Sequence, residues 1–280
     1  MKKNLLTAVA LVASVIVLVV GSVFGTIAYL TASSAVSNTF TVGSVAITMW
    51  ETKVNEDGVF DASETKVHTN SYHLVPGGMY MKNPTIEITS SLEGDDMFLY
   101  VKSRNGIRNI EEGNQTENPE PNAALSMRQQ MEKNGWVQLL TSADGKDIVW
   151  VYGTRDDNGV ITPTPVNKNH RQTRLQVATQ IVNDKISTIN VSDPAQVAES
   201  EAGKIQLCSF FKVDKRFTNL SEHNSSFVDF VAFAIQTSGI DSASAGWDAL
   251  KSAHENATAI INPKNPYDPS AGVYDAVPKA

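Results

Sequence analysis

The sequence predicts an all-β protein with short inserted helices, built as an antiparallel sandwich. In residues 175–181 and 205–213, apolar and polar side chains alternate, which is typical of strands buried on one face. Short strand-like segments are separated by polar turns, such as the Pro-Gly-Gly turn within residues 74–78. The few helical patterns are short and do not follow each strand in turn. This order favours antiparallel sheets over βαβ units.

The expected strands follow one another along the whole chain. Val45, Ile47 and Met49 share one face of a strand that begins after a bend at Gly43 and Ser44. Residues 97–102 are apolar at almost every position, which predicts a strand buried on both faces. The remaining strands are expected at 79–89, 136–140, 148–152, 175–181, 205–213 and 227–236, with 136–140 and 148–152 forming a hairpin.

Three helices are expected between or after these strands. The first covers 123–133, with Asn122 at its start and Asn134-Gly135 at its end. A second, short helix begins at Asp193-Pro194 and ends at Gly203. The third covers about 242–257 and carries Trp247 and Leu250 on one face. We expect one domain over residues 38–261, followed by an irregular, proline-rich tail over residues 262–280.

The N-terminus has the layout of an export signal. Two lysines precede a long apolar run, and Thr26 and Ala28 occupy the −3 and −1 positions of a cleavage site before Tyr29. We therefore expect residues 1–28 to be a signal peptide and the mature protein to be secreted. The apolar run is also long enough to span a bilayer, so an uncleaved membrane anchor remains an alternative.

Charge and cysteine content exclude several classes of protein. Loss of the two signal lysines changes the net charge from −7 to −9, and an acidic surface disfavours binding to nucleic acid or to anionic membranes. Cys208 is the only cysteine, so no internal disulfide can form, and its surroundings in the sequence favour a small semi-buried side chain over a nucleophile. Zinc-protease, hydrolase and phosphate-binding motifs are absent. We predict a protein that is not an enzyme and needs no cofactor.

Five residues are weak candidates for a metal site. His68 and His73 flank a polar stretch, but their spacing matches neither one helix face nor one strand face. Asp57, Asp61 and Glu64 lie in an acidic loop that contains a glycine, without the spacing of a twelve-residue calcium loop. A solvated loop with exposed histidines is the favoured interpretation, and we predict no bound metal.

Two motifs resemble a known family of exported proteins. Residues 25–31 (GTIAYLT) with 38–45 (NTFTVGSV) look like the start of proteins that a SipW-type signal peptidase processes. Residues 74–84 (LVPGGMYMKNP) look like the second signature of that family, and 233–236 (FAIQ) before Trp247 are similar to a recurring C-terminal pattern. The family is that of TasA, a biofilm-matrix fibre protein, and camelysin.

The resemblance implies a jelly-roll-like subunit of extracellular biofilm-matrix fibres. Its partners would be copies of itself, joined head to tail by donation of an N-terminal strand, and the SipW-type signal peptidase during export. Residues 29–37 are uncharged and free of proline, so they suit pairing with an open sheet edge of the next subunit. Contact with the membrane would end when the signal is cleaved. The expected donor residues are Tyr29, Leu30, Thr31, Ala32, Ser33, Ser34, Ala35, Val36 and Ser37.

Two other functions remain alternatives at this stage. Camelysin is described as a cell-surface metalloprotease, although this sequence lacks an obvious three-ligand site with a general base. An uncleaved signal would instead give a membrane-anchored adhesin.

Overall fold

The computed structural model describes residues 31–35, 38–39, 45–90, 96–115, 122–143, 145, 147–217, 220, 228–257 and 275–276. The expected signal peptide, its cleavage residues Ala28 and Tyr29, and Leu30, Val36 and Ser37 lie outside these residues. Within the described part of the chain, no helix is long and apolar enough to cross a membrane.

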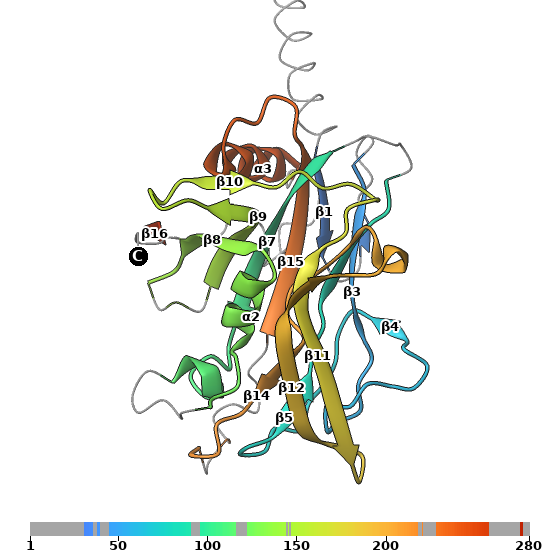
Figure 1. Ribbon diagram of the computed structural model, residues 1–280. Coiled ribbons are helices and arrows are strands. Elements are labelled where there is room, and N and C mark those ends of the chain that lie inside the picture. Colours follow the sequence, from blue (N-terminus) through green and yellow to red (C-terminus); the bar gives the residue numbers. More distant parts are fainter. Residues whose placement is uncertain are drawn as a thin grey trace, which may run out of the picture.

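The protein consists mainly of antiparallel strands (Figure 1). The longest pairing in the larger sheet runs from Val228 opposite Asn105 to Gln236 opposite Met97. In spatial order this sheet contains β16 (Asp275–Ala276), β8 (Trp136–Thr141), β9 (Asp147–Arg155), β7 (Met97–Asn105), β15 (Val228–Gln236), β1 (Thr31–Ala35) and β2 (Asn38–Thr39), with β10 (Ile161–Pro163) paired to β9.

A second sheet faces the larger one across the main core. The core includes Ile47 and Ile86 from the second sheet and Leu99, Trp150 and Ala234 from the larger one, all of them almost completely buried. The second sheet contains β13 (Lys204–Gln206), β6 (Thr85–Ile88), β3 (Ile47–Thr52) and β4 (Lys66–Val67). Two further pairs are β14 (Phe210–Lys212) with β5 (Met79–Met81), and β11 (Thr173–Val182) with β12 (Lys185–Gln196).

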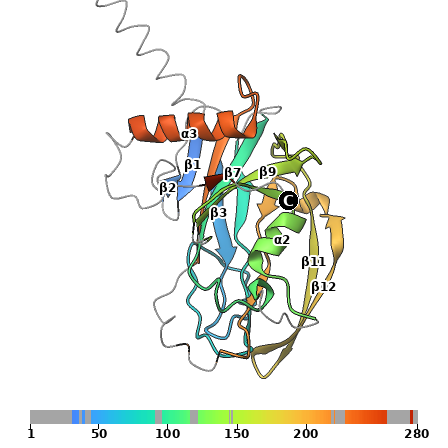
Figure 2. The same cartoon turned by 90° about the vertical axis from the view of Figure 1, so that its left-hand side faces the viewer.

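Two α-helices are present among the described residues, α2 (Met127–Lys133) and α3 (Ala243–Ala257). The expected helix at 242–257 is confirmed as α3, which crosses one end of the larger sheet (Figure 2). Trp247 and Leu250 of α3 are buried in a second core with Tyr100 and Phe233. The larger sheet is therefore covered on both faces, which explains why β7 and β15 are apolar at successive positions.

The prediction of a helix between Asp193 and Gly203 is wrong. Strand β12 continues to Gln196 because it pairs with β11, with Ala195 opposite Arg174. A 3₁₀ turn (Glu199–Glu201) follows the strand. Pro194 is compatible with this position because β12 is an edge strand of a two-stranded sheet.

Three other expected elements are corrected. Helix α2 begins at Met127, not at residue 123, because Ser126 and Gln129 form a capping box that satisfies the first amides. The strand expected at 79–89 is divided into β5 and β6, and the strand expected at 205–213 is divided into β13 and β14. The chain changes partner between them, since β13 pairs with β6 and β14 pairs with β5.

Candidate functional site

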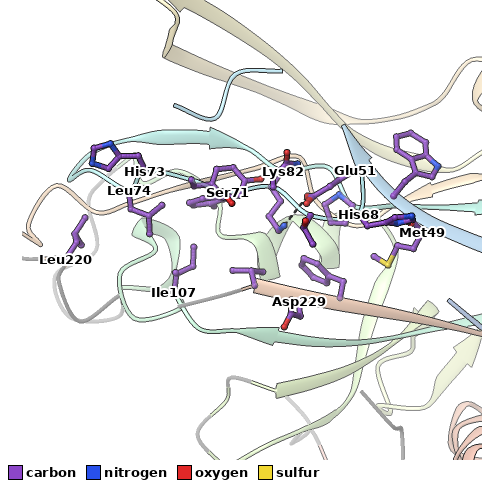
Figure 3. A pocket seen from close by; sticks show the side chains of 18 residues that line it. Met49, Glu51, His68, Ser71, His73, Leu74, Lys82, Ile107, Leu220 and Asp229 are labelled. Carbon is purple, nitrogen blue, oxygen red and sulfur yellow. Dashed lines mark hydrogen bonds and ion pairs between the residues drawn. The ribbon is translucent and has the colours of Figure 1, made fainter. Parts of the chain in front are cut away.

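A cavity of about 460 Å³ lies beside the first residues of β15, between that strand and the second sheet (Figure 3). This volume falls in the range of pockets that accept small molecules or the side chains of a partner. Its walls come from β3, from residues 68–74 and from β15. Residues that line it include Met49, Glu51, His68, Ser71, His73, Leu74, Lys82, Ile107, Leu220 and Asp229.

The wall of the cavity contains a buried ion pair. Lys82 Nζ lies 3.0 Å from Glu51 Oε2, and the two side chains are only 7% and 6% exposed. Glu51 is carried by β3 and Lys82 directly follows β5, so the pair joins two different sheets. The ammonium also lies 5.8 Å from the ring centre of Tyr72 and 5.9 Å from that of Phe230. These contacts hold a buried charge beside two aromatic rings.

Aromatic side chains give this wall a defined shape. Tyr72 packs edge-on against Tyr80 and Phe211, with ring centres 5.8 and 5.2 Å apart. The Tyr72 hydroxyl donates a hydrogen bond to the carbonyl of Met81 at 3.1 Å. Burial, together with the nearby carboxylate of Glu51, raises the pKa of Tyr72 far above its ordinary value. Tyr72 therefore remains a neutral hydrogen-bond donor at any physiological pH.

The two histidines proposed as weak metal ligands both line the cavity, but at opposite ends of it (Figure 3). His68 Nδ1 lies 3.1 Å from the carbonyl oxygen of Met49. The structure therefore does not bring His68 and His73 together as a pair of ligands.

Two of the three acidic candidates in the 55–64 loop, Asp57 and Asp61, interact with other residues. Asp57 forms an ion pair with Lys185 at 3.4 Å. Asp61 accepts hydrogen bonds from the hydroxyl and amide of Ser63, which lower the pKa of its carboxyl group. Glu64 has a positive φ of 49° in a turn. Among the residues described here, no group of three or more His, Cys, Asp or Glu side chains is arranged to hold a metal ion.

Cys208 is completely buried in the main core, more deeply than the sequence suggested. Burial raises the pKa of its thiol well above the ordinary value. The thiol is therefore protonated at neutral pH, and a protonated thiol is a poor nucleophile.

The N-terminal strand β1 pairs with β15 of the same molecule. Its register places Thr31 opposite Ile235 and Ser34 opposite Ala232. Strand β2 pairs antiparallel with β1, with Ala35 opposite Asn38. The expected donor residues 31–35 thus occupy a sheet edge in their own molecule. An isolated chain has only its own edge to pair with, which gives a physical reason for this closed arrangement.

The cavity lies beside β15, just beyond the part of β15 that pairs with β1. Strand β1 pairs with β15 as far as Ala232, and the cavity is lined by Val228, Asp229 and Phe230 of β15. A longer N-terminal strand that continued in the same register would run into the cavity. The edge of β15 and the cavity together form the candidate site.

No pattern in the sequence pointed to the Glu51–Lys82 pair, Tyr72 or Phe230 as parts of a site. Lys82 follows Met79, Tyr80 and Met81, and a lysine at the end of an apolar stretch was the one available signal. Its partner is 31 residues away in the sequence, and only the pairing of the sheets brings the two together.

No family of known proteins, no curated protein and no solved structure matches this chain.

Proposed function

We propose that this protein is the structural subunit of extracellular biofilm-matrix fibres. Each jelly-roll-like subunit contributes its N-terminal strand to the next one, and the contact propagates head to tail as a filament. The observation that supports this most directly is that β1 pairs with the edge of β15, while the first residues of β15 line the cavity. A site that accepts this strand from the same molecule has the pairing groups to accept it from another.

The proposed filament forms by exchange of β1 between molecules. The main-chain bonds to Ala232–Ile235 are the same in both arrangements, so the exchange changes little in pairing energy. In the monomer, the covalent link gives β1 an effective concentration in the millimolar range, which favours the closed form. A further stabilising contact is therefore needed in the filament.

The cavity offers such a contact. Because Ser34 lies opposite Ala232, an extended strand in the same register would place Val36 opposite Phe230, at the wall of the cavity. This requires β2 to separate from β1. Burial of a valine side chain contributes on the order of 1.5–3 kcal/mol to the straightened strand.

A disulfide that locks β1 in its own molecule tests the proposal. Ala32 and Ala234 are register partners, and opposed residues of antiparallel strands lie close enough for a disulfide. The Ala32→Cys/Ala234→Cys variant of the chain from Tyr29 to Ala280 is oxidised as a monomer and examined by electron microscopy. We expect no filaments until a reductant is added, whereas the Ala32→Cys single variant assembles throughout. Filaments from the oxidised monomer would refute strand exchange.

A further inference from the structure

We infer that strand β11 is a second self-association surface, through which two copies of this chain pair antiparallel about a two-fold axis. The hairpin of β11 and β12 is a separate two-stranded sheet that packs over β5 and β14 (Figure 1). Among the described residues, no third strand pairs with either of its edges. An open edge of this length is a template for another strand.

The hairpin is held rigidly at its base. The amide of Leu175 donates to Asn134 Oδ1 at 2.8 Å, and Arg174 pairs with Glu201 at 3.7 Å. One face of the arm is anchored by Ile186, which is buried with Phe210 in a third small core. Because its position is already defined, the arm loses little conformational entropy when a partner binds.

The two edges of the hairpin differ in how they are protected. Both irregularities in the register place the extra residue on β12, which also contains Asp193 and Pro194. Bulges, charges and prolines are the usual devices that prevent edge-to-edge pairing. Residues 176–182 of β11 have no charge, proline or glycine, so β11 is the unprotected edge.

The main-chain groups of β11 point in the direction that pairing requires. The carbonyl of Gln180 accepts a hydrogen bond from the Ser187 hydroxyl of β12, so the main-chain groups of Gln180 point toward β12. Alternate residues face opposite edges, so Val177, Thr179 and Ile181 direct their amides and carbonyls outward. The amide of Leu175, which has the same parity, points outward to Asn134, in agreement with this assignment.

A second copy of the same strand fits this edge. With Thr179 opposite Thr179 of the other copy, Val177 lies opposite Ile181, and Ile181 is 52% exposed in the single molecule. Two chains of this acidic protein repel each other, and the uncharged stretch allows close approach. The same register brings Asp184 of each copy level with Arg174 of the other. Opposite charges therefore lie near both ends of the contact, where Arg174 also keeps its ion pair with Glu201 of its own copy.

Cross-linking tests this contact in the chain from Tyr29 to Ala280. A cysteine in place of Thr179 faces its own copy across the two-fold axis, with Cβ atoms about 5 Å apart. We expect a short bifunctional thiol reagent to give covalent dimers of Thr179→Cys. The control is Val160→Cys, at a position that is 58% exposed and outside the hairpin; it should give only collisional products. The native Cys208 is completely buried and does not contribute.

A second substitution separates pairing from random collision. Ile181→Asp in the Thr179→Cys chain puts a carboxylate opposite Val177 and should lower the dimer yield about tenfold or more. Val160→Asp in the same chain should leave the yield unchanged. Equal cross-linking of Thr179→Cys and Val160→Cys, or an undiminished yield with Ile181→Asp, would overturn the inference. The exchange of β1 is not needed for either result.

Discussion

Replacement of Lys82 by methionine is expected to destabilise the protein strongly. Methionine has nearly the same length as lysine, so the substitution removes the charge and leaves most of the packing against Tyr72 and Phe230. It leaves the Glu51 carboxylate, 6% exposed, without its cationic partner at 3.0 Å. The expected loss comes from this uncompensated charge.

The size of the effect follows from the burial of the pair. Removal of one partner of a buried ion pair costs about 3–5 kcal/mol, because the remaining charge is no longer solvated. For a chain of this size, each kcal/mol lowers the melting temperature by about 2–4 °C, so Lys82→Met should lower it by roughly 6–20 °C. The double variant Lys82→Met/Glu51→Gln removes both charges and should recover about half of the loss or more.

Urea unfolding of the monomeric chain, followed by circular dichroism, measures these differences. The structure supplies a matched control, because Lys66 and Glu87 form a shorter ion pair of 2.6 Å whose side chains are 50% and 30% exposed. Lys66→Met should cost about 1 kcal/mol or less despite the shorter distance. If Lys82→Met cost no more than Lys66→Met, the reasoning from burial would be refuted.

Two other predictions concern a buried acid and a close approach of backbone. Burial raises the pKa of Glu111 from 4.5 to about 7, so the folded state binds the proton more tightly than the unfolded state. As pH rises from about 4.5 to about 7, the wild-type free energy of unfolding should therefore fall by about 3 kcal/mol relative to that of Glu111→Gln. Parallel pH profiles of the two proteins would contradict this. Gly58 and Gly239 have nearly the same positive φ, 79° and 78°, but a Cβ on Gly58 would lie 2.7 Å from Tyr80 Cα while Gly239 has open space. Thermal unfolding should therefore show that Gly58→Ala costs about 1–3 kcal/mol more than Gly239→Ala.

Most of the strand positions were predictable from the sequence, because local patterns report them directly. The alternation in 175–181 and the apolar run in 97–102 both correspond to observed strands, β11 and β7. The predictions failed where residues distant in the sequence determine the conformation of a segment. Asp193-Pro194 has the composition of a helix start, yet pairing with β11 keeps this segment extended. Local propensity is weak compared with a continuous ladder of hydrogen bonds.

The candidate site was less predictable than the fold. The sequence identified an uncharged N-terminal segment suited to strand pairing, and the structure describes residues 31–35 of it as a strand. Its partner β15 lies about 200 residues away, and no local pattern shows which edge accepts it. The cavity is lined by segments that are far apart in the sequence, so it exists only after the sheets have packed.

The sequence by itself determined the antiparallel β class, the acidic charge and the α3 helix, because each depends on composition or on a short-range period. Tertiary structure alone decided that Lys82 lies beside Glu51, that the cavity continues the line of β1, and that no other strand of the described residues pairs with the outer edge of β11. The physical reason is that pairing between strands and burial of side chains are long-range events. A local pattern shows that a residue will be buried, but not what will bury it.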